Sequence, residues 1–274
     1  MKKCFFLFTI CLCSLTFASP IQDRTLDPKA LSQLTAALHI PQNADIVAET
    51  QKHWLRKAGQ ERWEITELSP DERLYVLNWA TEQGLFSPWK PLLKTYDKAL
   101  ILGATTSRMQ MRLDYLLQLW HEGTRFSEIV WLTGDRPLDK RVDGLTERCS
   151  TESEAAHILW KETTLPEEMR TLPVIFIAVP MKGEGPSLKR PSTEDTLIAW
   201  LKTTPEPCKS LFISDQPFCG YQFAVIKDCL PNTVPFDLVG QGVDPTTYQG
   251  AAITLDSIAR WIYQESLITK VGTK

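Results

Sequence analysis

The sequence predicts an α/β protein with a doubly wound, mainly parallel five-stranded sheet of the Rossmann-like type, preceded by a helical extension. After residue 96, short apolar runs alternate five times with helical patterns, which is how a parallel sheet wrapped by helices is encoded. Polar, turn-forming clusters follow the apolar runs, and such sheets bind ligands beyond the carboxyl ends of their strands. Residues 19–96 carry helical patterns without the intervening apolar runs.

The first eighteen residues have the pattern of a secretory signal peptide. Lys2 and Lys3 form a charged start, residues 4–17 are nearly all apolar, and Thr16 and Ala18 suit a cleavage site. This run is shorter than the about 20 residues that a spanning helix needs. We therefore expect cleavage, a secreted or periplasmic protein and no stable membrane span, with an uncleaved anchor as the less favoured alternative.

Three helices are expected in the extension, residues 19–96. The first two cover residues 27–38 and 45–55, which are amphipathic. The third begins after Ser69, because Pro70 suits the first helical position and Glu72 completes a capping box.

Four tryptophans fall within the extension, at positions Trp54, Trp63, Trp79 and Trp89. We expect them to pack the helices onto the sheet domain. The alternative is an exposed aromatic surface that contacts a protein partner or a glycan.

The Rossmann-like part is expected to span residues 97–274, with strands and helices in regular alternation. Strands are predicted at 99–102, 129–132, 174–179, 211–213 and 236–239, and helices at 107–121, 152–162, 193–202, 217–230 and 251–267. Connections between parallel strands are right-handed almost without exception, so helices should cover both faces.

The charge balance and the cysteines limit the partners and the covalent structure. With 30 basic and 33 acidic residues the chain offers no basic stripe, so nucleic acid is not an expected partner. Four cysteines follow the signal. Cys208 precedes the fourth strand and Cys229 ends the helix that returns from it, so both should lie at one edge of the sheet. We predict a disulfide between them, with two separate buried thiols as the alternative.

The first strand runs into a polar helix start that resembles an anion site. It contains Gly103, Thr105, Thr106, Ser107 and Arg108, and Arg112 follows one turn later. Helix amides, hydroxyls and guanidinium groups all favour negative charge, so we expect a phosphate or carboxylate to bind here. An ordinary turn with solvated arginines is the alternative. The cluster lacks the glycines of a dinucleotide fingerprint, so no specific cofactor is predicted.

The second strand is followed by Thr133, Gly134, Asp135 and Arg136, and Glu154 lies at the next helix start. Asp135 and Glu154 are the candidate catalytic residues, as proton carriers, although helix capping explains carboxylates at such positions equally well. No metal site is predicted, because these carboxylates have no histidine beside them.

The third and fourth strands lead into two further helix starts. We expect them to add ligand-binding groups at the same edge of the sheet, namely Arg190, Ser192, Thr193, Asp195, Ser214, Asp215 and Tyr221. Cys219 lies in a helix first turn, but no histidine is near it in sequence, so a nucleophilic role is disfavoured.

Read in order, the clusters resemble the YdcF, SanA and ElyC family, a Rossmann-like family of poorly defined chemistry. The resemblance covers about residues 97–242 and rests on four short motifs: Leu102, Gly103, Arg108 and Arg112; Thr133 and Gly134; Ser153, Glu154 and Ala155; and residues 193–196. The family's last motif, with a histidine and then an arginine, is not kept, since Phe218 and Tyr221 stand near those positions.

The resemblance implies a role in envelope carbohydrate or lipid-carrier metabolism, by analogy. Together with the clusters it predicts an exported protein that binds a small anionic, phosphorylated ligand, with phosphoryl or glycosyl-phosphate hydrolysis as the reaction if there is one. The competing prediction is a non-catalytic envelope or secreted interaction protein that contacts a protein partner through residues 19–96.

Overall fold

The computed structural model describes residues 24–41, 43–57, 60, 68–185, 188–203, 207–231 and 234–271. The predicted signal peptide, residues 1–18, and Trp63 lie outside the described residues.

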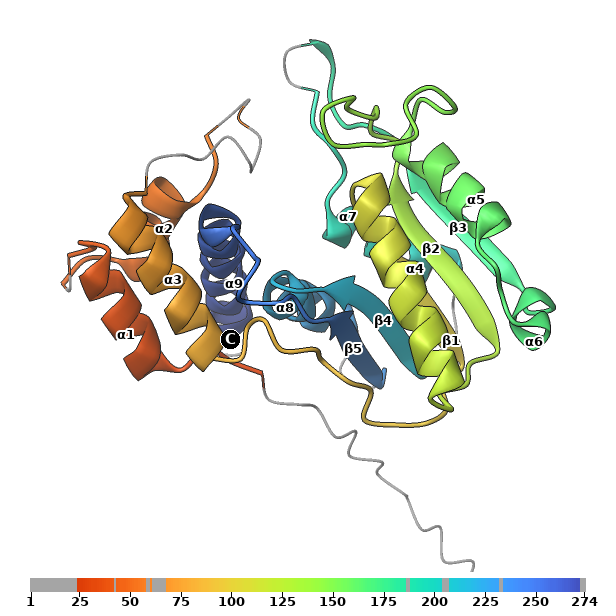
Figure 1. Cartoon of the computed structure of the whole chain (residues 1–274), viewed down its shortest axis with the longest axis horizontal. Coiled ribbons are helices and arrows are strands. Elements are labelled where there is room, and N and C mark those ends of the chain that lie inside the picture. Colours follow the sequence, from red (N-terminus) through yellow and green to blue (C-terminus); the bar gives the residue numbers. More distant parts are fainter. Residues whose placement is uncertain are drawn as a thin grey trace, which may run out of the picture.

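The sheet has five strands, all parallel, in the order β3-β2-β1-β4-β5 (Figure 1). The strands are β1 (Lys98–Leu102), β2 (Glu128–Gly134), β3 (Val174–Val179), β4 (Ser210–Asp215) and β5 (Phe236–Gln241). Each predicted strand is present, and the predicted α/β class is confirmed. Between β1 and β4 the chain reverses its direction of winding, which is where parallel sheets of this type bind ligands.

Helices cover both faces of the sheet. α4 (Thr106–His121) and α5 (Glu152–Glu162) lie on one face, and α7 (Thr193–Thr203) and α8 (Cys219–Cys229) on the other. Side chains of β1 divide accordingly, since Ile101 packs in the core with α4 whereas Leu100 packs in the core with α7 and α8. This alternation follows from the two-residue period of a strand, and burial on both faces accounts for the continuous apolar runs.

One short helix, α6 (Glu167–Arg170), was not predicted. Its four residues are too few to produce a helical period in the sequence. The predicted start of α8 at Pro217 is also wrong, because the helix begins two residues later, at Cys219. The Phe218 amide donates to the Asp215 carbonyl oxygen over 3.0 Å, so a turn occupies the predicted first residues.

The extension and the last helix form a further helical layer beside β5 (Figure 1). It consists of α1 (Pro28–Ala37), α2 (Ile46–Trp54), α3 (Pro70–Glu82) and α9 (Ala251–Val271). These helices share an apolar core that includes Trp54, Trp79 and Trp261, and α9 packs against α8. Packing is thus the role of Trp54 and Trp79. The predicted capping box of α3 is formed by Ser69 and Glu72.

The predicted Cys208–Cys229 disulfide is not formed, since both residues are free cysteines. Cys208 Sγ lies 3.4 Å from Ser210 Oγ, with Lys98, Asp97 and Glu128 as its charged neighbours. The charged neighbours of Cys229 are different residues, on α7 and α8. The two thiols are therefore separate, as in the alternative that the sequence left open, but both residues are half-buried rather than buried.

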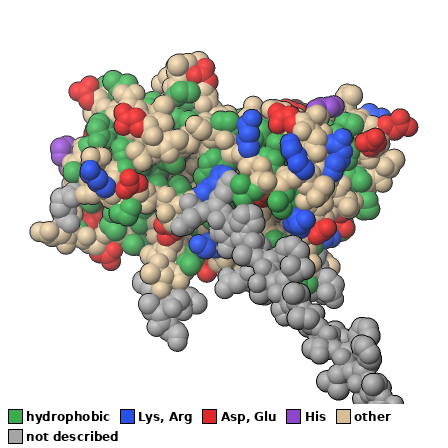
Figure 2. Space-filling view, turned by 90° about the horizontal axis from the view of Figure 1, so that it is seen from below, with side chains coloured by type: hydrophobic (Ala, Val, Ile, Leu, Met, Phe, Trp, Pro, Cys, Tyr) green, Lys and Arg blue, Asp and Glu red, His purple; other side chains and the backbone are tan. Residues whose placement is uncertain are grey.

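Within the described residues, no helix has both the length and the apolar content that crossing a bilayer requires. On the face shown in Figure 2, basic and acidic side chains are interspersed.

Candidate functional site

A cavity of about 550 Å³ lies at the carboxyl ends of the strands, between the sheet and the helical layer. It brings together many of the predicted ligand-binding residues: Gly103, Thr105, Ser107, Arg108, Arg112, Gly134, Arg136, Arg190, Ser192, Thr193 and Tyr221. Its volume falls in the range of about 300–1,000 Å³ that is typical of small-molecule sites. The predicted location of the site is therefore occupied by a cavity of suitable size.

The lining of the cavity is rich in arginine. Among the described residues, the lining contains six arginines, Arg56, Arg108, Arg112, Arg136, Arg190 and Arg260, and two carboxylate residues, Asp139 and Glu152. The whole chain has the opposite balance, with a formal charge of −3. Arginine side chains are thus concentrated at this edge of the sheet, and four of them pair with the buried carboxylates of Asp215, Asp143, Glu152 and Asp256.

Two of the arginines are organised by Asp215, the last residue of β4. The Asp215 carboxylate is fully buried and accepts hydrogen bonds from Arg112 Nε and Arg108 Nη1, the first over 2.8 Å. Arg112 Nη1 also donates to the carbonyl oxygens of Leu102 and Gly103 over 2.6 and 2.9 Å. Most of the Arg112 donors are thus used within the protein, so this residue supports the floor of the cavity. Arg108 is a quarter exposed and can reach a ligand.

Arg136 forms a second buried cluster beside the first. Its Nε donates to Glu152 over 2.6 Å, its Nη1 to Asp143 over 2.9 Å, and its Nη2 to the Ala104 carbonyl oxygen over 2.9 Å. Burial lowers the pKa of Arg136, but the hydrogen bonds and charges of the two carboxylates raise it by more, so the guanidinium stays charged. This cluster ties the loop after β2 to the start of α4.

The Glu152 side chain lies against the carboxyl ends of β1 and β2. Its Oε1 accepts from the Gly134 amide over 3.2 Å and lies where a Cβ on residue 103 would stand. Gly103 is therefore required by the close approach of this side chain. Burial raises the pKa of Glu152, and the charge of Arg136 opposes the shift. A buried carboxylate with a raised pKa in a cavity is a candidate for proton transfer.

The start of α4 faces the cavity with its first turn. The first amides of a helix have no partner within the helix. The Thr106 amide donates to Asp143 over 2.9 Å, and the next two residues, Ser107 and Arg108, line the cavity. The predicted anion-binding helix start thus faces the cavity.

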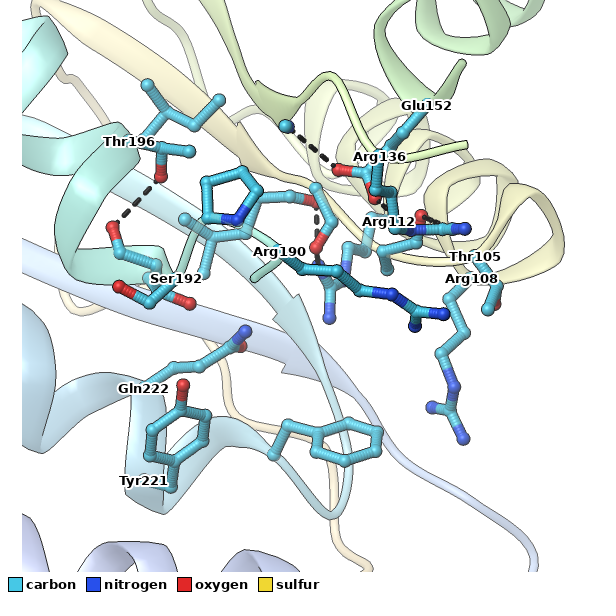
Figure 3. A pocket seen from close by; sticks show the side chains of 18 of the residues that line it. Thr105, Arg108, Arg112, Arg136, Glu152, Arg190, Ser192, Thr196, Tyr221 and Gln222 are labelled. Carbon is cyan, nitrogen blue, oxygen red and sulfur yellow. Dashed lines mark hydrogen bonds and ion pairs between the residues drawn. The ribbon is translucent and has the colours of Figure 1, made fainter. Parts of the chain in front are cut away.

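Three side chains from other elements point into the same space. Figure 3 shows Arg190 reaching toward the middle of the cavity, with Tyr221 and Gln222 of α8 on another side. Arg190 lies in the loop that enters α7 and is exposed, whereas Gln222 is buried and its Oε1 accepts from Ser214 Oγ. A guanidinium group from the loop before α7 therefore meets a phenol and an amide from α8 at this cavity.

Several predicted residues do not line the cavity because they have structural partners. Thr106, Thr133, Ser214 and Asp215 are buried, and Asp195 belongs to a reciprocal cap with Ser192 at the start of α7 and pairs with Lys182. Asp215 affects the cavity indirectly, because it positions Arg108 and Arg112, which line it.

Neither candidate catalytic residue lines the cavity. Glu154 is exposed and forms the capping box of α5 with Thr151, and Asp135 accepts a hydrogen bond from Ser153 Oγ. Capping, the alternative offered by the sequence, accounts for Glu154. Among the residues whose structure is described, the carboxylates that line the cavity are Glu152 and Asp139.

Other residues that line the cavity were not predicted from the sequence. Glu152 lies two residues before Glu154, and the signal that separates them is the Thr151-x-x-Glu154 spacing, which marks Glu154 as the capping residue. Arg56 and Arg260 come from the helical layer, and no local pattern indicates that they face a site on the sheet.

The described part of the chain contains no group of three or more His, Cys, Asp and Glu side chains arranged to hold a metal ion. The Cys219 thiol is fully buried, and burial raises its pKa, so the structure gives no support to a nucleophilic role for Cys219.

Fold and site together define a Rossmann-like α/β protein with an arginine-lined cavity at the carboxyl edge of its sheet. No family model, curated protein or solved structure matches the chain.

Proposed function

We propose that this protein binds a small anionic, phosphorylated ligand in the cavity at the carboxyl edge of the sheet. The observation that carries the proposal is the concentration of guanidinium groups, since six arginines line the cavity within the described residues. Arginine recognises phosphate with paired, charge-assisted hydrogen bonds, and the first turn of α4 adds oriented amides.

The arginines divide into supporting and ligand-facing groups. Arg112 and Arg136 are buried, and their N–H groups donate to carboxylates and carbonyl oxygens of the protein. These two arginines therefore support the base of the cavity. Arg190 is exposed and reaches into the cavity (Figure 3). We therefore assign the first contact with the anion to Arg190, together with Arg108 and Ser107 on α4.

Hydrolysis of a phosphoryl or glycosyl-phosphate bond needs a proton carrier within reach of the ligand. Glu152 lines the cavity and its pKa is raised by burial, whereas Asp135 and Glu154 lie outside the lining. A hydrolytic activity would therefore depend on Glu152 among these three carboxylates.

Export and membership of the YdcF, SanA and ElyC family belong to the same proposal. They rest on the amino-terminal pattern and on the order of the four motifs. Phe218 stands at the position of the family's histidine. The Arg108 guanidinium carbon lies over the Phe218 ring, 4.5 Å from the ring centroid. An aromatic face replaces a proton-transfer group there, which favours ligand binding over the chemistry that a histidine would support.

The alternative function, an interaction protein that uses residues 19–96, has less support. Two of its tryptophans, Trp54 and Trp79, are buried in the helical core. The exposed large apolar side chains of this segment are Leu74, Tyr75 and Leu92 within the described residues. Three exposed apolar side chains, of which Leu74 and Tyr75 are adjacent in sequence, are ordinary for a protein surface.

A thermal-shift screen tests the proposal. We expect inorganic phosphate and sugar phosphates to raise the unfolding temperature, since a ligand that binds only the folded state stabilises it. Arg190→Gln should abolish the shift, whereas Lys189→Gln, an adjacent exposed cation outside the cavity lining, should preserve it. Equal shifts in the two variants, or none in the wild type, would contradict the proposal.

A further inference from the structure

Arginines face the cavity from two different layers of the molecule. Arg108 and Arg190 stand on the sheet side, at the starts of α4 and α7, whereas Arg56 and Arg260 stand on the helical layer, after α2 and on α9. A single phosphate group needs only one such set. The presence of a second set on the opposite layer raises the question of what it binds.

On the helical layer, a buried aspartate contacts the Arg260 side chain and the Arg56 backbone. Asp256 is fully buried and accepts from Arg260 Nε over 2.9 Å and from Arg260 Nη2 over 3.2 Å. The Arg56 backbone amide lies 3.4 Å from the same carboxylate, and Gln51 Nε2 donates to the Ala259 carbonyl oxygen over 2.7 Å. These bonds fix the end of α2 against α9, and with it the place from which the Arg56 side chain lines the cavity.

The sheet side has the same construction. There the fully buried Asp215 holds Arg112 and Arg108. On each wall a buried carboxylate holds arginine side chains, those of Arg108 and Arg112 through Asp215 and that of Arg260 through Asp256, which pre-organises them and reduces the entropy lost on binding. Between the walls, Tyr221 offers a ring with a polar tip and Gln222 an amide whose oxygen already accepts from Ser214.

We propose that the ligand carries two separated anionic groups on a polar, sugar-like centre, one group bound by each wall. The class is a sugar phosphate with a second phosphate or carboxylate. The inference rests on the proposed function and deepens it. The cavity of about 550 Å³ suits a ligand of this size better than a lone phosphate ion.

A matched pair of ligands tests the inference by titration calorimetry on the full mature chain: glucose 6-phosphate and glucose 1,6-bisphosphate. We expect the bisphosphate to bind about tenfold tighter or more, as one further charge-assisted contact implies. Arg56→Gln should remove that preference and leave the monophosphate affinity within about twofold. Lys57→Gln, the neighbouring exposed cation outside the cavity lining, should keep the preference.

The outcomes separate the two proposals. If the monophosphate binds but the bisphosphate binds no tighter, or if the preference survives Arg56→Gln, the two-anion inference is wrong while the proposed function stands. If neither ligand binds the wild type, both are wrong. Unchanged circular dichroism and unfolding temperature of the ligand-free variants confirm that the substitution leaves the fold intact.

Discussion

Asp215 accepts a hydrogen bond from Arg112 Nε over 2.8 Å, its carboxylate also lies 2.7 Å from Arg112 Nη2, and neither side chain is more than 2% exposed. This ion pair lies below the cavity and joins the end of β4 to α4. The sequence cluster from Gly103 to Arg112 resembles an anion site, but its Arg112 side chain has a structural role in this ion pair. The distinction between supporting and ligand-facing arginines leads to different expectations for their variants.

Arg112→Met should destabilise the protein by about 3–5 kcal/mol, because it leaves the Asp215 carboxylate buried with fewer partners. Urea unfolding measures this change. Arg108→Met should cost less, since Arg108 is a quarter exposed and Arg112 still neutralises Asp215. A free energy of unfolding for Arg112→Met within about 1 kcal/mol of the wild-type value would show that the Arg112–Asp215 ion pair does not stabilise this part of the fold.

Gly103→Ala should be destabilising by about 1–3 kcal/mol through overpacking. A Cβ at this position would overlap Glu152 Oε1 and stand 2.8 Å from the Leu132 carbonyl oxygen, which belongs to the backbone and cannot move aside easily. Gly144→Ala is the matched control, because a Cβ there meets nothing within 4 Å. Thermal unfolding of both variants should separate them, and equal stability would mean that Glu152 does not lie against β1.

The acid stability of the protein should depend on Asp143. Burial raises the pKa of Asp143, but the hydrogen bonds from Arg136 and from the Asp139 and Thr106 amides lower it by more. Because the folded pKa lies below the unfolded one, its contribution is present above the unfolded pKa of about 4 and is lost as pH falls through the folded pKa.

Asp143→Asn should therefore be less stable than the wild type at pH 7, and the gap should narrow as pH is lowered below about 4. Urea unfolding of both proteins across this range measures the gap. A gap that stays constant with pH would show that Asp143 does not stabilise the fold through its charge.

The cysteines should react as free thiols. Alkylation in denaturant without reductant, followed by peptide mapping, should label the peptides that contain Cys208 and Cys229. In the native protein Cys219 should remain unlabelled, because it is fully buried and its pKa is raised by that burial. Peptides joined through Cys208 and Cys229 before reduction would restore the disulfide that the sequence predicted.

The fold could be predicted from the sequence because its signals are local. The apolar run from Val174 to Val179 coincides with β3, and Ser69 with Glu72 forms the expected cap. The edge at which the cavity lies could be predicted as well, since the carboxyl ends of parallel strands meet at one edge of the sheet.

The division of labour within the site could not be predicted, because it depends on which way each side chain points. Glu152 and Glu154 are two residues apart in the first turn of α5, and only the first faces the strand ends. Arg56 and Arg260 are far apart in the sequence. The Arg56 backbone amide and the Arg260 side chain both contact Asp256, and these contacts depend on the packing of α2 against α9.

The central claim, that this cavity binds an anion, is tested most directly by locating one. Crystals soaked with tungstate, an electron-dense analogue of phosphate, should show an anomalous peak within hydrogen-bond reach of Arg190 and the Ser107 amide. The peak should be absent from Arg190→Gln crystals. Tungstate bound only elsewhere on the protein, or unchanged in the Arg190→Gln variant, would contradict the account.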